Sequence, residues 1–415
     1  MRAYEEYKDS GYDWLGKIPA HWRCVKIREI FIERRNKVSD KDFPPLSVTK
    51  AGIVPQLETA AKSDDGDNRK RVNVGDFVIN GRSDRKGSSG ISPLEGSVSL
   101  INHVLIPRLG VNKAFLHYLL RSNFFIEEFY KNGRGIVADL WTTRYSDMKT
   151  IRLPLPPREE QDAIVRFLDA KCAKIDSLIK LKERQIALLN EKKQNIINQA
   201  VTRGLDPNAP MKDSGVDYIG MIPSHWQVIL NHRLWEEKTR GYSTTETVLS
   251  LSQQDGVVPY EDMTERSLHT SSYDNWKLVF PGDLVLNRFK AHLGVFFSSA
   301  YRGIVTFHYG VFQFKMNGST KYYEYLYHTP KFCRVYASLS NGMTVGLQNL
   351  SNSHFYSAYS VYPPVHEQKE IVDKIETINV IYRNKIKIIE NEILILHEYK
   401  MKLISDVVTG KINIL

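Results

Sequence analysis

The sequence predicts an α+β chain made of two tandem copies of one unit. We expect the copies at opposite ends of an antiparallel pair of long coiled-coil helices, related by a pseudo-two-fold axis. Three observations predict this fold: a phrase written twice, further matches at a nearly constant spacing, and two long apolar stripes of helical period. The phrase KDSGYDWLGKIPAHW, at residues 8–22, returns as KDSGVDYIGMIPSHW at residues 212–226. Such self-similarity indicates a repeated architecture.

Further matches extend the duplication over the whole chain. GDFVIN, at residues 75–80, returns as GDLVLN at 282–287, and PPREEQ, at 156–161, returns as PPVHEQ at 363–368. The turn-rich residues 202–210 separate the copies. These boundaries predict four segments: a globular domain at 1–155, a long helix at 156–204, a second globular domain at 205–362 and a second long helix at 363–415.

The segment after each Pro-Pro predicts a helix of roughly 40 residues, about 60 Å long, because apolar residues recur there at steps of three and four. Lys182 and Lys193 interrupt the first stripe, and Asn379 and Lys400 the second. A helix packed only on its own domain would leave most of its stripe uncovered, so we expect each helix to pack on its duplicate. The stripes contain Ile164, Leu168, Ile175, Ile179, Ile186, Leu189 and Ile196 in the first helix, and Ile371, Ile375, Tyr382, Ile386, Ile389, Ile393, Leu396 and Leu403 in the second.

The globular segments predict mixed strands and short helices. Runs rich in β-branched and aromatic residues indicate strands at 76–80, 98–107 and 278–286. Short helices are expected at 113–130 and 322–338.

The repeated phrase indicates a structural role, because it is nearly the same in both copies whereas the loops differ. We expect tryptophans as buried anchors, prolines that fix a turn and histidines with satisfied partners. These residues are Trp22 and Trp226, Pro19 and Pro223, and His21 and His225.

The formal charge of +10 favours a polyanionic partner, although a solvated basic surface would give the same charge. No apolar run approaches the roughly 18 residues that cross a bilayer, and the N-terminal residues lack the apolar stretch of a signal peptide. We therefore expect a cytoplasmic protein. Three widely spaced cysteines predict neither a disulfide framework nor a zinc site.

Motifs for catalysis are missing from the sequence. GxxxxGK[ST], GxGxxG, HExxH and GxSxG do not occur, and the SxxK match at residues 83–86 is too short to indicate an active site. The histidines show no metal-ligand spacing beside a carboxylate cluster. We expect a chain that binds without catalysis and carries no metal or cofactor.

Loop-like segments of each copy carry side chains suited to DNA. Arginine and lysine can contact phosphates or guanine edges, and asparagine and glutamine suit adenine. Each residue could equally be a solvated loop side chain. The candidates are Arg69, Lys70, Arg71, Arg82, Arg85, Lys86, Arg134, Thr142, Thr143 and Arg144 in the first copy, and Arg288, Lys290, His292, Asn341, Thr344, Gln348 and Asn349 in the second.

The two opening phrases, the GD-strands and the PPxxEQxxI closures, at residues 156–164 and 363–371, resemble those of the specificity subunit of type I restriction-modification systems. The resemblance covers essentially the whole chain. It implies two target-recognition domains, each of which reads half of a split double-stranded DNA site, and two spacer helices that set the gap. The family's recognition loops share no residues, so the resemblance assigns no base contact. The second opening phrase has Tyr218-Ile219 where the first has Trp14-Leu15, which the sequence alone indicates to be an apolar change.

The resemblance also implies partners. Two modification subunits would bind the helices and carry S-adenosylmethionine and adenine N6-methyltransferase activity, and restriction subunits would add ATP-driven translocation and cleavage with magnesium. Two alternatives stay open: a specificity chain of a fused methylase-nuclease system, and a coiled-coil adaptor that does not bind DNA. A catalytic nuclease is disfavoured, because the sequence lacks clustered acidic residues for a metal.

Overall fold

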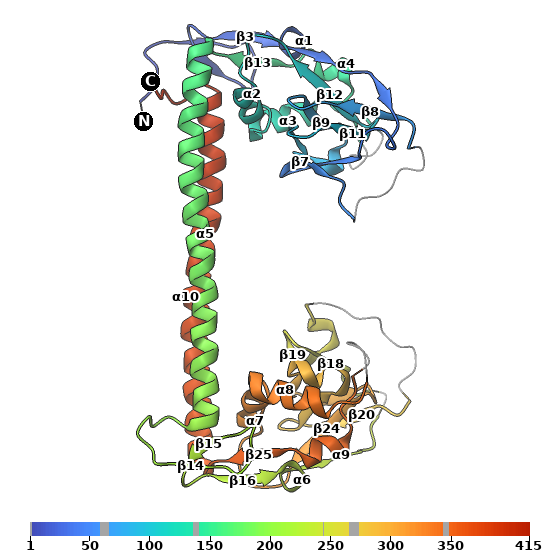
Figure 1. Cartoon of the computed structure of the whole chain (residues 1–415), viewed down its shortest axis with the longest axis vertical. Helices are drawn as coiled ribbons and strands as arrows, with labels where there is room; N and C mark the ends of the chain where they lie inside the picture. The colour runs from blue at the N-terminus through green and yellow to red at the C-terminus, as the bar shows by residue number, and fades with distance from the viewer. Residues whose placement is uncertain (1, 59–65, 136–140, 244, 265–273, 343–347) are drawn as a thin grey trace. The chain divides into compact units, whose positions relative to one another are not determined.

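The chain forms two compact units in a computed structural model that describes residues 2–58, 66–135, 141–243, 245–264, 274–342 and 348–415 (Figure 1). One unit contains Met1–Glu183 with Ile389–Leu415, and the other contains Arg184–Ile388. Each unit holds one globular domain and part of both long helices. No helix among the described residues is long and apolar enough to cross a membrane.

The first unit has short antiparallel sheets with helices beside them. Its larger sheets have the orders β10-β9-β12-β4 and β11-β8-β5, and β1-β2, β13-β3 and β6-β7 pair separately. The elements are β1 (Tyr7–Asp9), β2 (Lys17–Pro19), β3 (Arg23–Lys26), α1 (Ile27–Ile30), β4 (Phe31–Glu33), β5 (Lys37–Val38), β6 (Leu46–Thr49), β7 (Gly52–Pro55), β8 (Arg69–Val72), β9 (Phe77–Asn80), β10 (Ser89–Ile91), β11 (Gly96–Ser99), β12 (Asn102–Pro107), α2 (Lys113–Leu119), α3 (Asn123–Lys131), α4 (Tyr145–Met148), β13 (Arg152–Leu155) and the start of α5 (Arg158–Arg203).

The second unit repeats this plan. Its main sheet has the order β17-β24-β21-β22, and β14-β15, β16-β25, β18-β19 and β20-β23 form pairs. The elements are β14 (Met211–Asp213), β15 (Met221–Pro223), β16 (Gln227–Leu230), α6 (Asn231–Leu234), β17 (Trp235–Glu237), β18 (Leu249–Ser252), β19 (Gly256–Pro259), β20 (Lys277–Val279), β21 (Leu284–Asn287), β22 (Phe296–Ser298), β23 (Gly303–Val305), β24 (Tyr309–Phe314), α7 (Thr320–Tyr327), α8 (Pro330–Leu339), α9 (Asn352–Ser357), β25 (Tyr359–Tyr362) and the start of α10 (Val365–Val408).

The repeated phrase is part of the structural frame in both units, as predicted. Trp22 and Trp226 are fully buried. His21 Nε2 lies 2.8 Å from Glu160 Oε2, and His225 Nε2 lies 2.8 Å from Glu367 Oε2. Each phrase is therefore joined to the Glu-Gln pair at the start of the long helix of its own copy.

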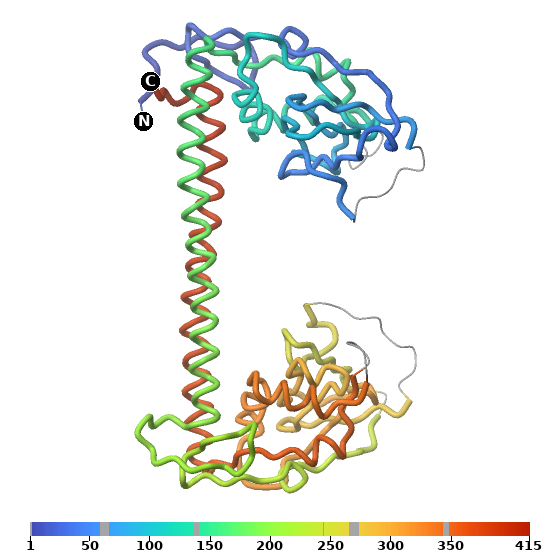
Figure 2. Tube along the Cα trace, in the orientation of Figure 1, coloured from blue at the N-terminus to red at the C-terminus, as the bar shows by residue number. Residues whose placement is uncertain are grey.

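The predicted stripes pack between the two helices within each unit, and both views show α5 and α10 side by side (Figures 1 and 2). In the first unit, Ile164 and Leu168 share a core with Leu403. In the second, Ile371 and Ile375 share a core with the last turns of α5. The remaining stripe residues are buried or half-buried. These side chains pack inside the chain, so a partner would bind another face of the helices.

Two expected helices are each broken into two. The segment 113–130 forms α2 and α3, because Ser122 leaves helical geometry and accepts a hydrogen bond from the Phe125 amide as an N-cap. The segment 322–338 is divided in the same way between α7 and α8, where Thr329 is the N-cap and Pro330 begins α8. The apolar pattern continues through both breaks, which explains why the sequence predicts one helix.

The expected strands at 98–107 and 278–286 are also interrupted. A turn separates β11 from β12, and another, with Gly282 at φ +89°, separates β20 from β21. Asp283, in this second turn, forms an ion pair with Arg240. Asp76, at the corresponding position of the first copy, forms one with Arg34 at 2.8 Å. The aspartate of each GD-strand is thus a structural anchor.

Candidate nucleic-acid interface

Candidate loop segments of the first copy converge around Thr142. Arg134 and Thr142 exchange backbone hydrogen bonds of 3.2 and 3.1 Å. The next amide, that of Thr143, donates to the Gly81 carbonyl at 2.9 Å, and Arg82 forms an isolated β-bridge with Thr142. Segments that lie some 50 residues apart in the sequence therefore share one small backbone frame.

The second copy builds the same frame with different residues. Asn341 and Asn349 exchange backbone hydrogen bonds of 3.0 and 2.8 Å, as Arg134 and Thr142 do. The Leu350 amide donates to the Arg288 carbonyl at 3.0 Å. Backbone bonds fix the frame, so the side chains projecting from it can differ without disturbing the fold.

The most accessible cations of the first frame are only weakly paired. The Arg134 side chain is 78% exposed and lies 3.3 Å from Asp147. The Arg85 side chain is 67% exposed and lies 3.7 Å from Asp84. Arg144, immediately before α4, is exposed as well. Because exposed ion pairs of this kind contribute little to stability, their guanidinium groups can exchange a carboxylate for a phosphate or a base edge at small cost.

Other candidates of this frame are tied more closely to the protein. Arg82 pairs with Asp84 at 3.0 Å, and Lys86 pairs with Glu127 at 2.6 Å. Thr143 is fully buried, and its hydroxyl donates to a backbone carbonyl. Its place in the frame is structural, whereas half-exposed Thr142 presents its side chain at the surface.

The candidates on β8 do not take part in the frame. Arg69 is 5% exposed and donates to Ser97 Oγ at 2.8 Å, and burial lowers the pKa of its guanidinium. Lys70 Nζ donates to a backbone carbonyl at 2.7 Å. Arg71 pairs with Glu95 at 2.7 Å. These residues hold the sheet together, and Lys70 also borders a cationic hollow.

The candidates of the second copy are also divided between held and exposed side chains. Arg288 is held by Glu237, at 2.7 Å from its carboxylate. Lys290 is exposed, and His292 is half-buried with its Nδ1 buried and unpartnered within the described structure. Gln348 is half-buried, Asn341 and Asn349 are exposed, and Thr344 lies outside the described residues.

Sequence reasoning missed Arg35, Lys37 and Lys149, which line a hollow together with Lys70. Arg35 and Lys37 belong to a short basic run, RRNK at residues 34–37, whereas Lys149 lies far from it in the sequence. Only the pairing of β5 with β8 brings Lys37 opposite Lys70. A local pattern carries no signal of that pairing.

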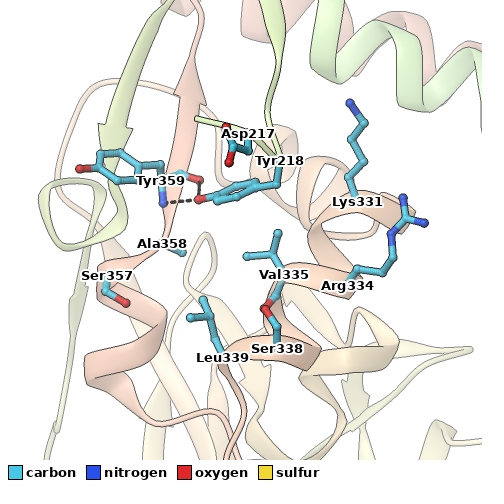
Figure 3. A pocket seen from close by; sticks show the side chains of 10 residues that line it. All are labelled: Asp217, Tyr218, Lys331, Arg334, Val335, Ser338, Leu339, Ser357, Ala358 and Tyr359. Atoms are coloured by element: carbon cyan, nitrogen blue, oxygen red, sulfur yellow. Dashed lines mark hydrogen bonds between the residues drawn. The ribbon is translucent and has the colours of Figure 1, made fainter. Parts of the chain in front are cut away.

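A second hollow, of about 560 Å³, lies in the second unit between the repeated phrase and α8 (Figure 3). The Tyr218 hydroxyl donates to the Tyr359 carbonyl at 2.9 Å and accepts from the Tyr359 amide at 2.6 Å. Trp14, in the same place of the first phrase, has no hydroxyl, so the change between the phrases is more than the apolar change expected from the sequence. Lys331 and Arg334 line the hollow from α8.

Within the described parts of the chain, no group of three or more histidine, cysteine, aspartate or glutamate side chains could hold a metal ion.

The curated proteins that this chain resembles in sequence are specificity subunits of type I restriction-modification systems, and the solved structures that share its fold include an HsdS subunit. In sequence, the chain is 26% identical over 239 residues to the MjaX type I restriction enzyme specificity subunit of Methanocaldococcus jannaschii, across 52% of this chain and 53% of that protein. It is 26% identical over 188 residues to the EcoDI specificity subunit of Escherichia coli, across 45% of this chain and 39% of that protein. The chain thus spans about half the length of the curated relatives it matches, or less. No family model matches it.

Solved structures share the fold over nearly the whole chain. A chain described under complex assembly and conformational transition of the type I restriction-modification system has a TM-score of 0.65 at 15% identity, covering 95% of this chain and 99% of that chain. The HsdS subunit of Thermoanaerobacter tengcongensis has a TM-score of 0.52 at 16% identity, covering 97% of this chain and all of that chain.

Proposed function

We propose that the chain is the DNA-specificity subunit of a type I restriction-modification complex. Each copy, residues 1–155 and 205–362, reads one half of a split double-stranded DNA site, and the helical segments at 156–204 and 363–415 set the gap between the halves. The observation that carries the proposal is the backbone frame built twice with different polar side chains, at Arg134 and Thr142 and at Asn341 and Asn349. One scaffold that displays two side-chain sets suits a site with two unlike halves.

The proposal assigns direct DNA contacts first to the exposed and half-exposed candidates of the frames. These are Arg82, Arg85, Lys86, Arg134, Thr142 and Arg144, with Lys290, Asn341, Gln348 and Asn349. Arg69, Arg71, Thr143 and Arg288 would support them from within the protein, since their polar groups are bonded internally.

The chain itself would be a non-catalytic, cytoplasmic recognition subunit without a cofactor. Two modification subunits would supply S-adenosylmethionine and adenine N6 methylation. Restriction subunits would supply ATP-driven translocation and magnesium-dependent cleavage. These assignments follow from the resemblance to specificity subunits.

A docking face for the modification subunits is available on the helices of each unit. In the first unit, Leu181, Leu394 and Ile395 are each at least 60% exposed. In the second unit, Ile388 and Leu188 are 60% and 54% exposed. Large apolar side chains repeated along an exposed helical face indicate a protein-binding surface. Changing Leu394 and Ile395 together to glutamate should abolish co-purification of a modification subunit and leave the helical content of the chain unchanged.

The decisive experiment is a genome-wide map of N6-methyladenine in a methylation-free bacterial host that expresses the chain with and without a cognate modification subunit. A split motif that appears only with both proteins is the expected result. A soluble, associated pair that adds no methylation would contradict the proposal and favour the adaptor function.

A further inference from the structure

A hollow of about 360 Å³ in the first unit has a strongly cationic wall. It lies where the end of β4, strands β5 and β8 and the C-terminal end of α4 meet. Four cations, Arg35, Lys37, Lys70 and Lys149, line it together with one carboxylate, Glu33. The wall therefore has an excess of positive charge.

The single carboxylate does not neutralise these cations. Glu33 is engaged by Arg35 at 2.7 Å. Lys70 Nζ donates to the uncharged carbonyl of Asn102. Lys37 and Lys149 form no ion pair with any residue that the structure describes. At least two ammonium groups are thus available to an anion.

Strand pairing makes the excess charge unfavourable in the free protein. Lys37 on β5 lies directly opposite Lys70 on β8. Like charges at directly opposite positions of an antiparallel pair destabilise it. Burial lowers the pKa of Lys70, with Glu33 acting in the opposite direction and the charge of Arg35 in the same direction. A bound anion would relieve this repulsion.

The fold itself does not require this cluster, because the second copy lacks it. There Glu237 takes the place of Glu33 and is paired with both Lys277, at 2.8 Å, and Arg288, at 2.7 Å. Lys277 Nζ also donates to the Tyr309 carbonyl, which repeats the bond from Lys70 to Asn102. The positions that match Arg35, Lys37 and Lys149 in the repeat are occupied by uncharged residues, Thr239, Gly241 and Tyr356.

We propose that this hollow is a phosphate-binding site, occupied by a backbone phosphate of double-stranded DNA. The inference rests on the proposed function and extends it to a contact that fixes position without reading sequence. Lysines present point charges that suit a phosphate without requiring a particular base. The site adjoins the first frame, since Arg144 directly precedes α4, whose first residue, Tyr145, also lines the hollow.

The test compares two double variants of the full chain in complex with its modification subunits. K37A/K149A removes the two unpaired cations of the hollow. K41A/K113A removes two exposed lysines elsewhere in the same domain that form no ion pair within the described residues, and it is the matched control for net charge. The affinity of each complex is measured across a salt series for duplexes with and without the motif that the N6-methyladenine map identifies. K37A/K149A should weaken binding to both duplexes by a similar factor and reduce the slope of log K against log salt by about two, whereas the control should change neither by as much.

A third variant separates binding from folding. In K37E the new carboxylate faces Lys70, so its melting temperature should equal or exceed that of the wild type, yet DNA binding should be weaker than in K37A. If K37A/K149A and K37E both keep the wild-type DNA affinity and salt slope, the phosphate site is overturned, whereas the specificity function is unaffected. A wild-type complex that shows no preference for any motif and no methylation would overturn both.

Titration with inorganic phosphate distinguishes a backbone phosphate of DNA from free phosphate as the ligand of the hollow. Calorimetric titration of the DNA-free complex should show binding only at millimolar phosphate, as expected for a site that takes one phosphate of a long polyanion. Micromolar binding of inorganic phosphate, lost in K37A/K149A while DNA affinity is unchanged, would overturn the DNA assignment.

Discussion

Lys400 on α10 donates to both carboxylate oxygens of Asp176 on α5, at 2.6 and 2.7 Å. A second pair, Lys182 with Glu392 at 2.6 Å, lies further along the same two helices and within the same unit. From the first pair to the second the residue number increases on α5, from 176 to 182, and decreases on α10, from 400 to 392, so the helices run antiparallel here. Both lysines are polar interruptions of the apolar stripes, and their partners lie on the opposite helix. The two pairs set the register of α5 against α10.

This register makes the helices a testable spacer. Seven residues inserted after Lys182, matched by seven inserted before Glu392, would preserve the heptad phase and lengthen the helical pair by about 10 Å. At 3.4 Å per base pair, the gap in the methylated motif should grow by about three base pairs while both half-sites stay the same. The methylation map of the variant measures this directly. An insertion in α5 alone is the control and should lower stability, because it shifts one stripe against the other; an unchanged gap in the matched variant would contradict the spacer role.

The carboxylates at the start of the long helices provide a matched pair of stability predictions. Glu160 is buried and accepts hydrogen bonds from Tyr4 Oη at 2.6 Å and from His21. Glu367 receives the Trp226 indole N–H at 2.9 Å as well as His225. Replacing either by glutamine weakens charge-assisted hydrogen bonds, so each variant should lose about 1–3 kcal/mol of unfolding free energy.

Urea unfolding of the full chain measures both losses. Arg158→Gln is a suitable control, because this residue is exposed and its one ion pair among the described residues is with Asp162 on its own helix. Its effect should stay below about 1 kcal/mol. If Glu160→Gln were no more costly than this control, the buried carboxylate would not be the anchor of the repeated phrase.

The sequence predicts the structural role of the repeated phrase well, because the tryptophan and the histidine of the phrase have strict structural requirements. Trp22 and His21 recur as Trp226 and His225, and their burial and bonds recur with them. The stripe of α5 is similarly predictable, since the helical period places its residues on one face. The sequence does not predict the break at Ser122, because the apolar pattern continues on both sides of this N-cap residue.

The candidate site was predictable only in part. The segments at Arg134 and Arg82 stand out as basic and loop-like, but their meeting at Thr142 depends on backbone bonds over long sequence separations. The cluster around Lys70 depends on strand pairing in the same way. Side chains such as Arg69 look like surface cations in the sequence, and only the fold shows that Ser97 engages them inside the protein.

His117 gives the first unit a predictable response to acid. Burial, followed by the charge of Arg121, lowers its pKa from 6.5 to about 4, while Asp169 acts in the opposite direction. The neutral ring accepts the Ile91 amide hydrogen bond at Nδ1. Because the folded-state pKa lies below the unfolded one, the stabilisation is complete above pH 6.5 and is lost as the pH falls from 6.5 towards 4.

The loss from this histidine should be of the order of 3 kcal/mol at most. Unfolding free energies at pH 7.5 and pH 5 measure it, and His117→Gln should flatten the difference between them. His397, on the exposed part of α10, is the control, and its replacement should leave the pH dependence as in the wild type. An equally steep pH dependence in His117→Gln would assign the acid response to another group.

Arg134 and Asn341 occupy the same place in the two frames, so they should affect different halves of the DNA site. Arg134→Ala removes a guanidinium suited to guanine, and Asn341→Ala removes an amide suited to adenine. Each change should relax one position of one half-site by about 1–3 kcal/mol in discrimination and leave the other half intact. Methylation maps of the two variants, and of the double variant, measure this. Since the altered positions lie in separate copies, the double variant should show the sum of both changes; relaxation of the same half-site by both single variants would contradict the assignment of one half-site to each copy.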